Sequence, residues 1–235
     1  TKHNVNITFS TSAAGQGVQN ASQTVTLSRT TPAFFHGLQL PTAAVSASGG
    51  NVTVKGKTNA AWIAESGSAK TSLQQAQAYA SREAQLNIPA LADNASNYGT
   101  NAGETVNTQV NVRYGLQGAV SNASGGTTIQ GTVPQKKYYV AAPNLTWNTS
   151  LLGTSKDGTM FSGPSGGSVD LKFPADVELP GNKARVRLTL KTAGTVVLAP
   201  QEIDVKQGGR LSFGAHNVWG TRTLCVEWYN PRTSS

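Results

Sequence analysis

Cysteine is nearly absent from this sequence, since Cys225 is the only one among 235 residues. A single cysteine can form neither a disulfide within the chain nor a cysteine metal cluster. It stands between apolar neighbours in RTLCVEWY, so we expect a small buried side chain and not a reactive thiolate. The sequence also lacks a run of about eighteen apolar residues, which argues against a membrane-spanning helix.

Charged residues are scarce as well, at 13% of the chain, against roughly 25% in average globular proteins. Ser, Thr, Asn, Gln and Gly take their place, a composition that recurs in secreted, cell-surface and particle-forming β-proteins. The net charge of +8 comes from scattered Lys and Arg. Because these form no dense basic run, we expect no nucleic-acid partner. The chain opens at Thr1 as a mature secreted chain would, and we expect an extracellular location.

Catalytic groupings are missing too. The histidines lie far apart in the sequence, at His3, His36 and His216. Nucleophilic catalysis needs a Ser or Cys, a His and a carboxylate brought together, and no stretch indicates such a set. The metal and phosphate motifs also fail, because SKDGTMFSGPSGG holds one acidic residue and SGPSGGS lacks the P-loop lysine. We predict no enzyme, no cofactor and no metal.

Alternation of apolar and polar residues is what the sequence has in abundance. It is clearest in NVTVKGK, ARVRLTLK and RTLCVEWY, and turn clusters such as SNASGG and SGPSGG separate the alternating stretches. Gly provides positive φ angles in such turns. The pattern predicts a mainly β protein, built as an antiparallel sandwich of the Ig-like or jelly-roll type.

One segment, TSLQQAQAYASREAQLNIP, reads as a helix because Ala and Gln dominate it. Ser72 and Gln75 have the spacing of a capping box, and Pro89 would stop the helix. We therefore predict one surface helix over about residues 72–86. For the domains we predict an N-terminal arm over 1–12, a β-rich half with the helix over 13–125, and a second β-rich half over 126–235. A single elaborated sandwich over 13–235 fits nearly as well.

The opening stretch VNITFS is an amphipathic strand that places Val5, Ile7 and Phe9 on one side. Two interpretations stay open. The strand either belongs to the sheet of its own chain or is an arm that pairs with a neighbouring chain.

The same stretch, HNVNITFSTSA with Asn6, Ile7 and Thr8, resembles the N-terminal extension of fimbrial (pilus) subunits of the chaperone–usher pathway, in particular the colonisation-factor group. LKTAGTV, which includes Lys191 to Val196, resembles a segment near the end of those pilins. The resemblance implies an Ig-like sandwich that lacks one strand and is completed by a neighbour's arm (donor-strand complementation). It also implies that Val5, Ile7 and Phe9 fill pockets in that neighbour.

Aromatic residues in Asn-rich turns are candidate receptor or glycan contacts. They are Trp147 with Asn148 in APNLTWNTS, and His216 with Trp219 in FGAHNVWG. An exposed Trp beside Asn suits stacking on a sugar ring, while packing under a loop is the ordinary alternative.

The leading functional prediction is a structural or adhesive subunit of an extracellular surface filament, assembled by β-strand donation. Its partners would be copies of itself or related subunits, together with a host glycan or surface receptor. Two alternatives remain open, a structural protein of a viral or phage particle (capsid or tail) and a secreted glycan-binding module.

Overall fold

The computed structural model describes residues 2–10, 22–148, 151–155, 158–162, 167–191, 195–213 and 221–229. The chain divides into two compact units. Unit 1 comprises residues 1–42, 51–89 and 108–133, and unit 2 comprises residues 43–50, 90–107 and 134–235. The predicted boundary at residues 125/126 lies within unit 1, between two of its strands.

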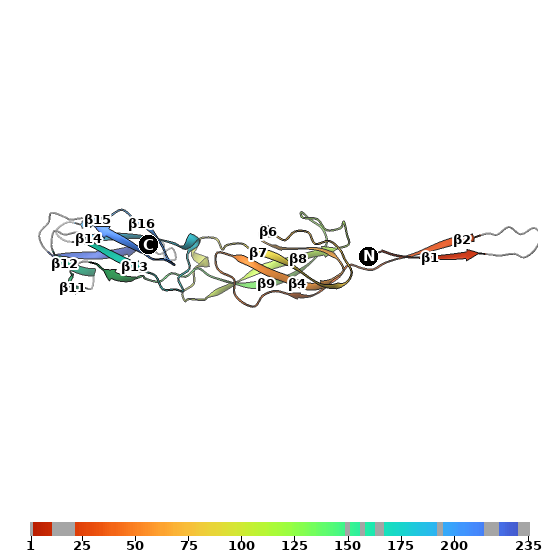
Figure 1. Cartoon of the computed structure of the whole chain (residues 1–235), viewed down its shortest axis with the longest axis horizontal. Helices are drawn as coiled ribbons and strands as arrows, with labels where there is room; N and C mark the ends of the chain where they lie inside the picture. The colour runs from red at the N-terminus through yellow and green to blue at the C-terminus, as the bar shows by residue number, and fades with distance from the viewer. Residues whose placement is uncertain are drawn as a thin grey trace, which may run out of the picture. The chain divides into compact units, whose positions relative to one another are not determined.

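Unit 1 is built from antiparallel strands in three sheets (Figure 1). A two-stranded sheet has the order β1-β2, a three-stranded sheet the order β3-β4-β7, and a four-stranded sheet the order β6-β5-β8-β9. The strands, some of which end in unit 2, are β1 (Lys2–Ser10), β2 (Ser22–Thr30), β3 (Phe35–Gln39), β4 (Gly50–Thr58), β5 (Ala61–Ser66), β6 (Ala69–Lys70), β7 (Ala80–Ile88), β8 (Thr105–Gly115) and β9 (Thr127–Lys136).

Unit 2 contains a three-stranded sheet with the order β10-β13-β17 and a six-stranded sheet with the order β11-β12-β18-β14-β15, in which β16 also pairs with β14. Its elements are η1 (Ala95–Asn97), β10 (Asn144–Trp147), β11 (Leu151–Ser155), β12 (Gly158–Ser162), β13 (Gly167–Lys172), η2 (Pro180–Asn182), β14 (Lys183–Lys191), β15 (Thr195–Val197), β16 (Gln201–Asp204), β17 (Gly209–Phe213) and β18 (Thr221–Trp228).

The predicted mainly β, antiparallel fold is confirmed in this coarse form. Within the described part of the chain, helical structure is confined to the short 3₁₀ turns η1 and η2. Burial follows the expected period of two, as in β4, where Val52, Val54, Gly56 and Thr58 are buried and the residues between them are exposed.

The predicted surface helix over residues 72–86 is wrong. The segment is extended, with the backbone of Gln74 exchanging two hydrogen bonds with that of Trp62 (2.9 and 2.8 Å), and it continues into β7. Leu86 and Ile88 are both buried at a spacing of two, which is strand periodicity. Helix propensity is a weak preference even for Ala and Gln, so pairing with the rest of the sheet overrides it.

Each unit has its own apolar interior. In unit 1 the ring of Phe35 lies 5.4 Å from that of Trp62 between centroids, and Trp62 and Ile63 on β5 are fully buried. In unit 2 a single core cluster takes side chains from both sheets. Its strand members include Val169, Leu171, Ala184, Val186, Leu188, Ile203 and Leu211.

Candidate functional site

The β1–β2 hairpin is the candidate site. Its strands pair antiparallel without a register shift, from Lys2 opposite Thr30 to Ser10 opposite Ser22. Residues 2–10 of the predicted arm over 1–12 therefore pair within their own chain, with a partner strand at residues 22–30. Among the described residues, the other edges of both β1 and β2 have no strand partner.

One face of the hairpin is a ladder of side-chain hydrogen bonds. The Thr26 hydroxyl donates to Asn6 Oδ1 (2.8 Å), and the Ser28 hydroxyl donates to Asn4 Oδ1 (2.8 Å). The hydroxyls of Thr8 and Thr24 lie 3.0 Å apart. Cross-strand polar pairs of this kind each add only a few tenths of a kcal/mol up to about 1 kcal/mol, so they fix the register more than they stabilise the hairpin.

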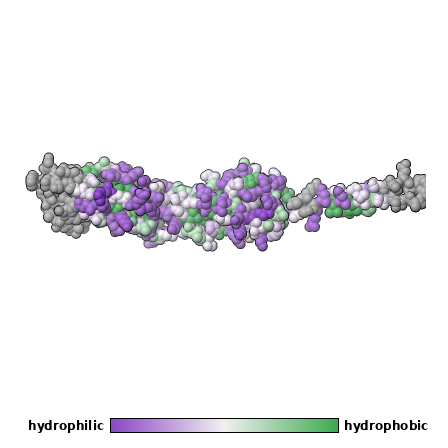
Figure 2. All heavy atoms as spheres, in the orientation of Figure 1, coloured by the Kyte–Doolittle hydropathy of each residue, from purple (hydrophilic) through white to green (hydrophobic). Residues whose placement is uncertain are grey.

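The opposite face is apolar and lies in water. Val5 is paired with Leu27 and Ile7 with Val25, so their side chains share this face with Phe9. Their exposed fractions are 58% for Val5, 39% for Ile7, 62% for Phe9, 42% for Val25 and 55% for Leu27. Figure 2 shows these hydrophobic side chains gathered along one side of the hairpin.

This exposure is costly for a hairpin. An isolated two-stranded sheet is only marginally stable in water. Full burial of a Val, Leu, Ile or Phe side chain contributes about 1.5–3 kcal/mol, so covering five half-exposed ones would contribute on the order of 5 kcal/mol. The face therefore has the character of a contact surface.

Val25 and Leu27 are the members of this face that the sequence reasoning missed as site residues. The signal was present in SQTVTLSRT, where both alternate with polar residues as Ile7 does in β1. What the sequence left open was the pairing of the two segments, because residues 11–21 separate them.

The predicted receptor residues on β10 have partners inside unit 2. Trp147 is half-buried and packs against the core cluster. The Asn148 backbone N–H donates to the Ser168 carbonyl (2.8 Å), and its side-chain amide donates to Asp170 Oδ2 (2.8 Å). The other two candidates, His216 and Trp219, lie outside the described residues.

Asp170 is an exposed anionic centre beside Asn148. Arg210 Nε and Nη2 donate to its two carboxylate oxygens at 2.5 and 2.9 Å. These hydrogen bonds, followed by the one from Asn148, lower the pKa of Asp170 to about 2. The bidentate contact neutralises the carboxylate and leaves it little capacity for an outside ligand.

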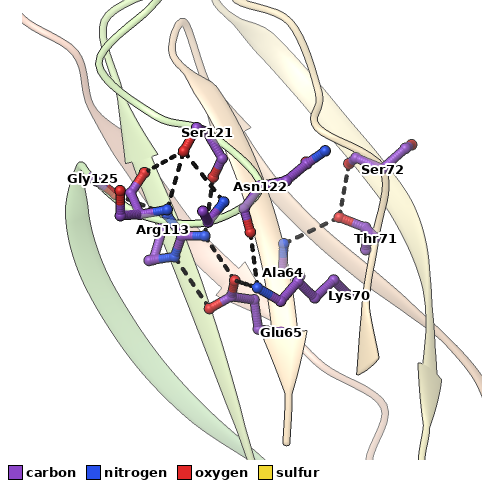
Figure 3. A network of polar contacts seen from close by, with 11 residues as sticks. Ala64, Glu65, Lys70, Thr71, Ser72, Arg113, Ser121, Asn122 and Gly125 are labelled. Carbon is purple, nitrogen blue, oxygen red and sulfur yellow. Dashed lines mark hydrogen bonds and ion pairs between the residues drawn. The ribbon is translucent and has the colours of Figure 1, made fainter. Parts of the chain in front are cut away.

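A second ion network, in unit 1, centres on Arg113 (Figure 3). Its Nη2 and Nε donate to Glu65 at 2.7 and 3.1 Å, and its guanidinium also donates to the carbonyls of Gly125 (3.0 Å) and Ser121 (3.1 Å). Lys70 Nζ lies 3.3 Å from Glu65 Oε1. The hydrogen bond from Arg113 is the largest influence that lowers the pKa of Glu65. The network ties the loop after β8 to β5, which is a structural role.

The described residues contain no group of three or more His, Cys, Asp or Glu side chains placed to bind a metal ion. They also contain no helix with the length and hydropathy needed to cross a membrane.

Comparison of the chain with family models, with curated proteins and with solved structures gave no match. The case for a function therefore rests on the residues and geometry described above.

Proposed function

We propose that the protein is a structural subunit of an extracellular surface filament and that the β1–β2 hairpin joins one copy to the next. The observation that carries this proposal is the exposed apolar face of Val5, Ile7, Phe9, Val25 and Leu27. The polar, weakly charged composition of the chain also supports an extracellular assembly.

The contact that we propose is strand addition. The free edge of β1 adds to a sheet of the next copy through main-chain hydrogen bonds, while Val5, Ile7 and Phe9 enter its apolar interior. β2 remains paired with β1 and accompanies it, so the donated element is a hairpin and not a lone strand. We propose as the acceptor an Ig-like sandwich in unit 2, whose two sheets share one core cluster.

A second copy is the partner that the energetics and composition favour. The apolar face contributes on the order of 5 kcal/mol, while association costs at least about 4 kcal/mol, so the contact must also use the free backbone edge of β1. A lipid surface suits this hairpin poorly because the connecting residues 11–21, TSAAGQGVQNA, hold no aromatic, Leu, Lys or Arg side chain that would anchor it there. Each copy then has one arm and one acceptor, and such head-to-tail contacts generate filaments.

A structural protein of a viral or phage particle is the second candidate function. One observation favours it, namely that β1 is already paired with β2 along its whole length. A preformed hairpin can pack against a neighbouring subunit in a shell or tail. This contact needs no groove that accepts a single strand.

The test compares two charge insertions on opposite faces of β1. Ile7→Asp places a carboxylate on the apolar face, whereas Asn6→Asp places one on the polar face and keeps the oxygen that accepts from Thr26. We expect the wild type and Asn6→Asp to self-associate with concentration in sedimentation experiments, and Ile7→Asp to remain a monomer. Circular dichroism must show the same β content in all three proteins.

Negative-stain microscopy of the associated wild type then separates the two candidates. Fibres support the filament, and shells or rings support the particle. A wild type that stays monomeric at all concentrations, or an Ile7→Asp variant that assembles as the wild type does, would contradict assembly through the hairpin.

A further inference from the structure

Unit 2 has a pocket of about 490 Å³ beside the paired strands β14 and β18. It is lined by Arg185, Val186 and Arg187 from β14, by Glu227 and Trp228 from β18, and by Tyr229 and Pro200. A second pocket of about 200 Å³ shares Arg185 and Tyr229 with it. Pockets of a few hundred Å³ with an apolar wall and a few polar groups are typical small-ligand sites.

The strand register places these side chains. In β14, the buried residues Ala184, Val186 and Leu188 alternate with exposed Arg185 and Arg187. Arg187 is directly opposite Glu227 on β18, and the Tyr229 N–H donates to the Arg185 carbonyl (2.9 Å). Both arginines therefore project from the same face of the sheet, beside the end of β18.

The two arginines differ in their charge partners. Arg187 Nε lies 2.5 Å from Glu227 Oε2, and the Thr189 hydroxyl also donates to that oxygen (3.3 Å). Within the described part of the chain, no carboxylate lies within ion-pair distance of the Arg185 guanidinium, although Glu202 is its cross-strand neighbour. Arg185 can therefore accept an anionic group from outside the chain.

Two aromatic side chains line the same pocket as Arg185. Tyr229 is 49% exposed and Trp228 is half-buried. A Tyr or Trp whose polar atom is exposed to solvent offers an apolar ring face together with a hydrogen-bonding group. This combination suits a sugar ring, which carries hydroxyl groups.

The charges of the pocket restrict the anion. Arg185, Arg187 and Glu227 together carry a net charge of +1, because Arg187 is paired with Glu227. A carboxylate balances that charge and pairs with a single guanidinium, whereas a phosphate carries nearly two negative charges and exceeds it. Arg185 beside the aromatic ring of Tyr229 therefore favours a ring that carries one carboxylate.

We propose that this pocket binds an acidic sugar, with Arg185 on its carboxylate and Tyr229 against its ring. The site lies away from the residues of the hairpin contact in sequence, and it needs no assembly. Failure of this proposal and failure of the proposed function are therefore separate results.

The test uses the full chain with N-acetylneuraminic acid and galacturonic acid as probes and galactose as the neutral counterpart. Binding is measured by ligand-observed NMR and by titration at low salt. We expect the acidic sugars to bind at least tenfold more tightly than galactose. Raising the salt concentration should weaken them, because an exposed ion pair is screened.

Three variants assign the contacts. Arg185→Gln should weaken acidic-sugar binding at least tenfold, and Tyr229→Ala should weaken acidic sugars and galactose alike. The control is Arg82→Gln in unit 1, which removes the same charge from a side chain that donates only to the Ala78 carbonyl among its described contacts (2.9 Å), and it should leave binding unchanged.

Several results would overturn the proposal. One is that galactose binds as well as galacturonic acid. Another is that Arg185→Gln binds acidic sugars as the wild type does, and a third is that neither acidic sugar binds. Inorganic phosphate or a short glutamate-rich peptide that occupies the pocket more tightly than the sugars would replace the acidic sugar as its ligand.

Discussion

Replacing Arg113 by Met tests how unit 1 is held together. The change keeps a long apolar side chain and removes only the guanidinium, which makes two hydrogen bonds to Glu65 and one each to the carbonyls of Gly125 and Ser121. Both charged side chains are largely shielded, with exposed fractions of 12% for Arg113 and 17% for Glu65.

The expected loss follows from these contacts. Removing one partner of a buried ion pair destabilises a protein by about 3–5 kcal/mol, because the other charge is left without compensation. Here Lys70 still lies 3.3 Å from the Glu65 carboxylate, which offsets part of that cost. We expect Arg113→Met to lower the free energy of unfolding of unit 1 by about 3 kcal/mol.

Hydrogen exchange read by mass spectrometry on peptides from β5 and β8 measures this loss locally. This choice matters because a chain with two units need not unfold in one step. An opening free energy that is lower by about 3 kcal/mol corresponds to exchange roughly a hundredfold faster. Lys70→Met is the matched control, because an exposed pair contributes only about 0–1 kcal/mol.

The dependence on pH gives a second check. The folded state lowers the pKa of Glu65 below its ordinary value of 4.5, chiefly through the hydrogen bond from Arg113. The stabilisation is therefore fully present above pH 4.5 and is lost as the pH falls through the lowered, folded-state pKa. The gap between wild type and Arg113→Met should narrow over that acidic range. Equal exchange in the two proteins at pH 7, or a gap that does not change with pH, would refute the reasoning.

Two further predictions concern a turn and an exposed carboxylate. Gly126→Ala should lower the melting temperature of unit 1 by several degrees more than Gly118→Ala. Both glycines have positive φ angles (87° and 85°), so either substitution strains the backbone. Only at Gly126 would the new Cβ also meet backbone, at 2.6 Å from the Tyr114 carbonyl oxygen. In an NMR titration, Asp170 should lose its charge near pH 2, and Arg210→Gln should raise that pKa toward its ordinary value of 3.8, because the hydrogen bond from Arg210 is the largest cause of the shift.

Part of the candidate site was predictable because strand amphipathicity is a local property. The residues Val5, Ile7 and Phe9 share one side of any extended backbone, whatever that backbone pairs with. The aromatic residues were harder to interpret. Trp147 lies in an Asn-rich stretch that suits an exposed contact, yet the structure packs it against the core of unit 2. Composition around a residue does not determine which side of the sheet faces the core.

The predicted helix shows that local propensity does not determine secondary structure either. Residues 72–86 have helix-favouring Ala and Gln, while the strand signal of Leu86 and Ile88 is short. Propensity differences of a few tenths of a kcal/mol per residue are smaller than the gain from sheet hydrogen bonding and burial. The pocket at Arg185 was not predictable either, since Arg185, Pro200 and Tyr229 are separated in sequence and meet only through the pairing of β14 with β16 and β18.

The sequence by itself determined that this chain forms antiparallel strands, because alternation and turn residues act over a few neighbouring positions. It also determined that the first strand has one apolar side. Only the tertiary structure decided that β2 is the partner of that strand, that five apolar side chains remain in water, and that Arg185 lies beside Tyr229. These features depend on which distant segments pair, and pairing is chosen by the total free energy of burial and hydrogen bonding over the whole fold.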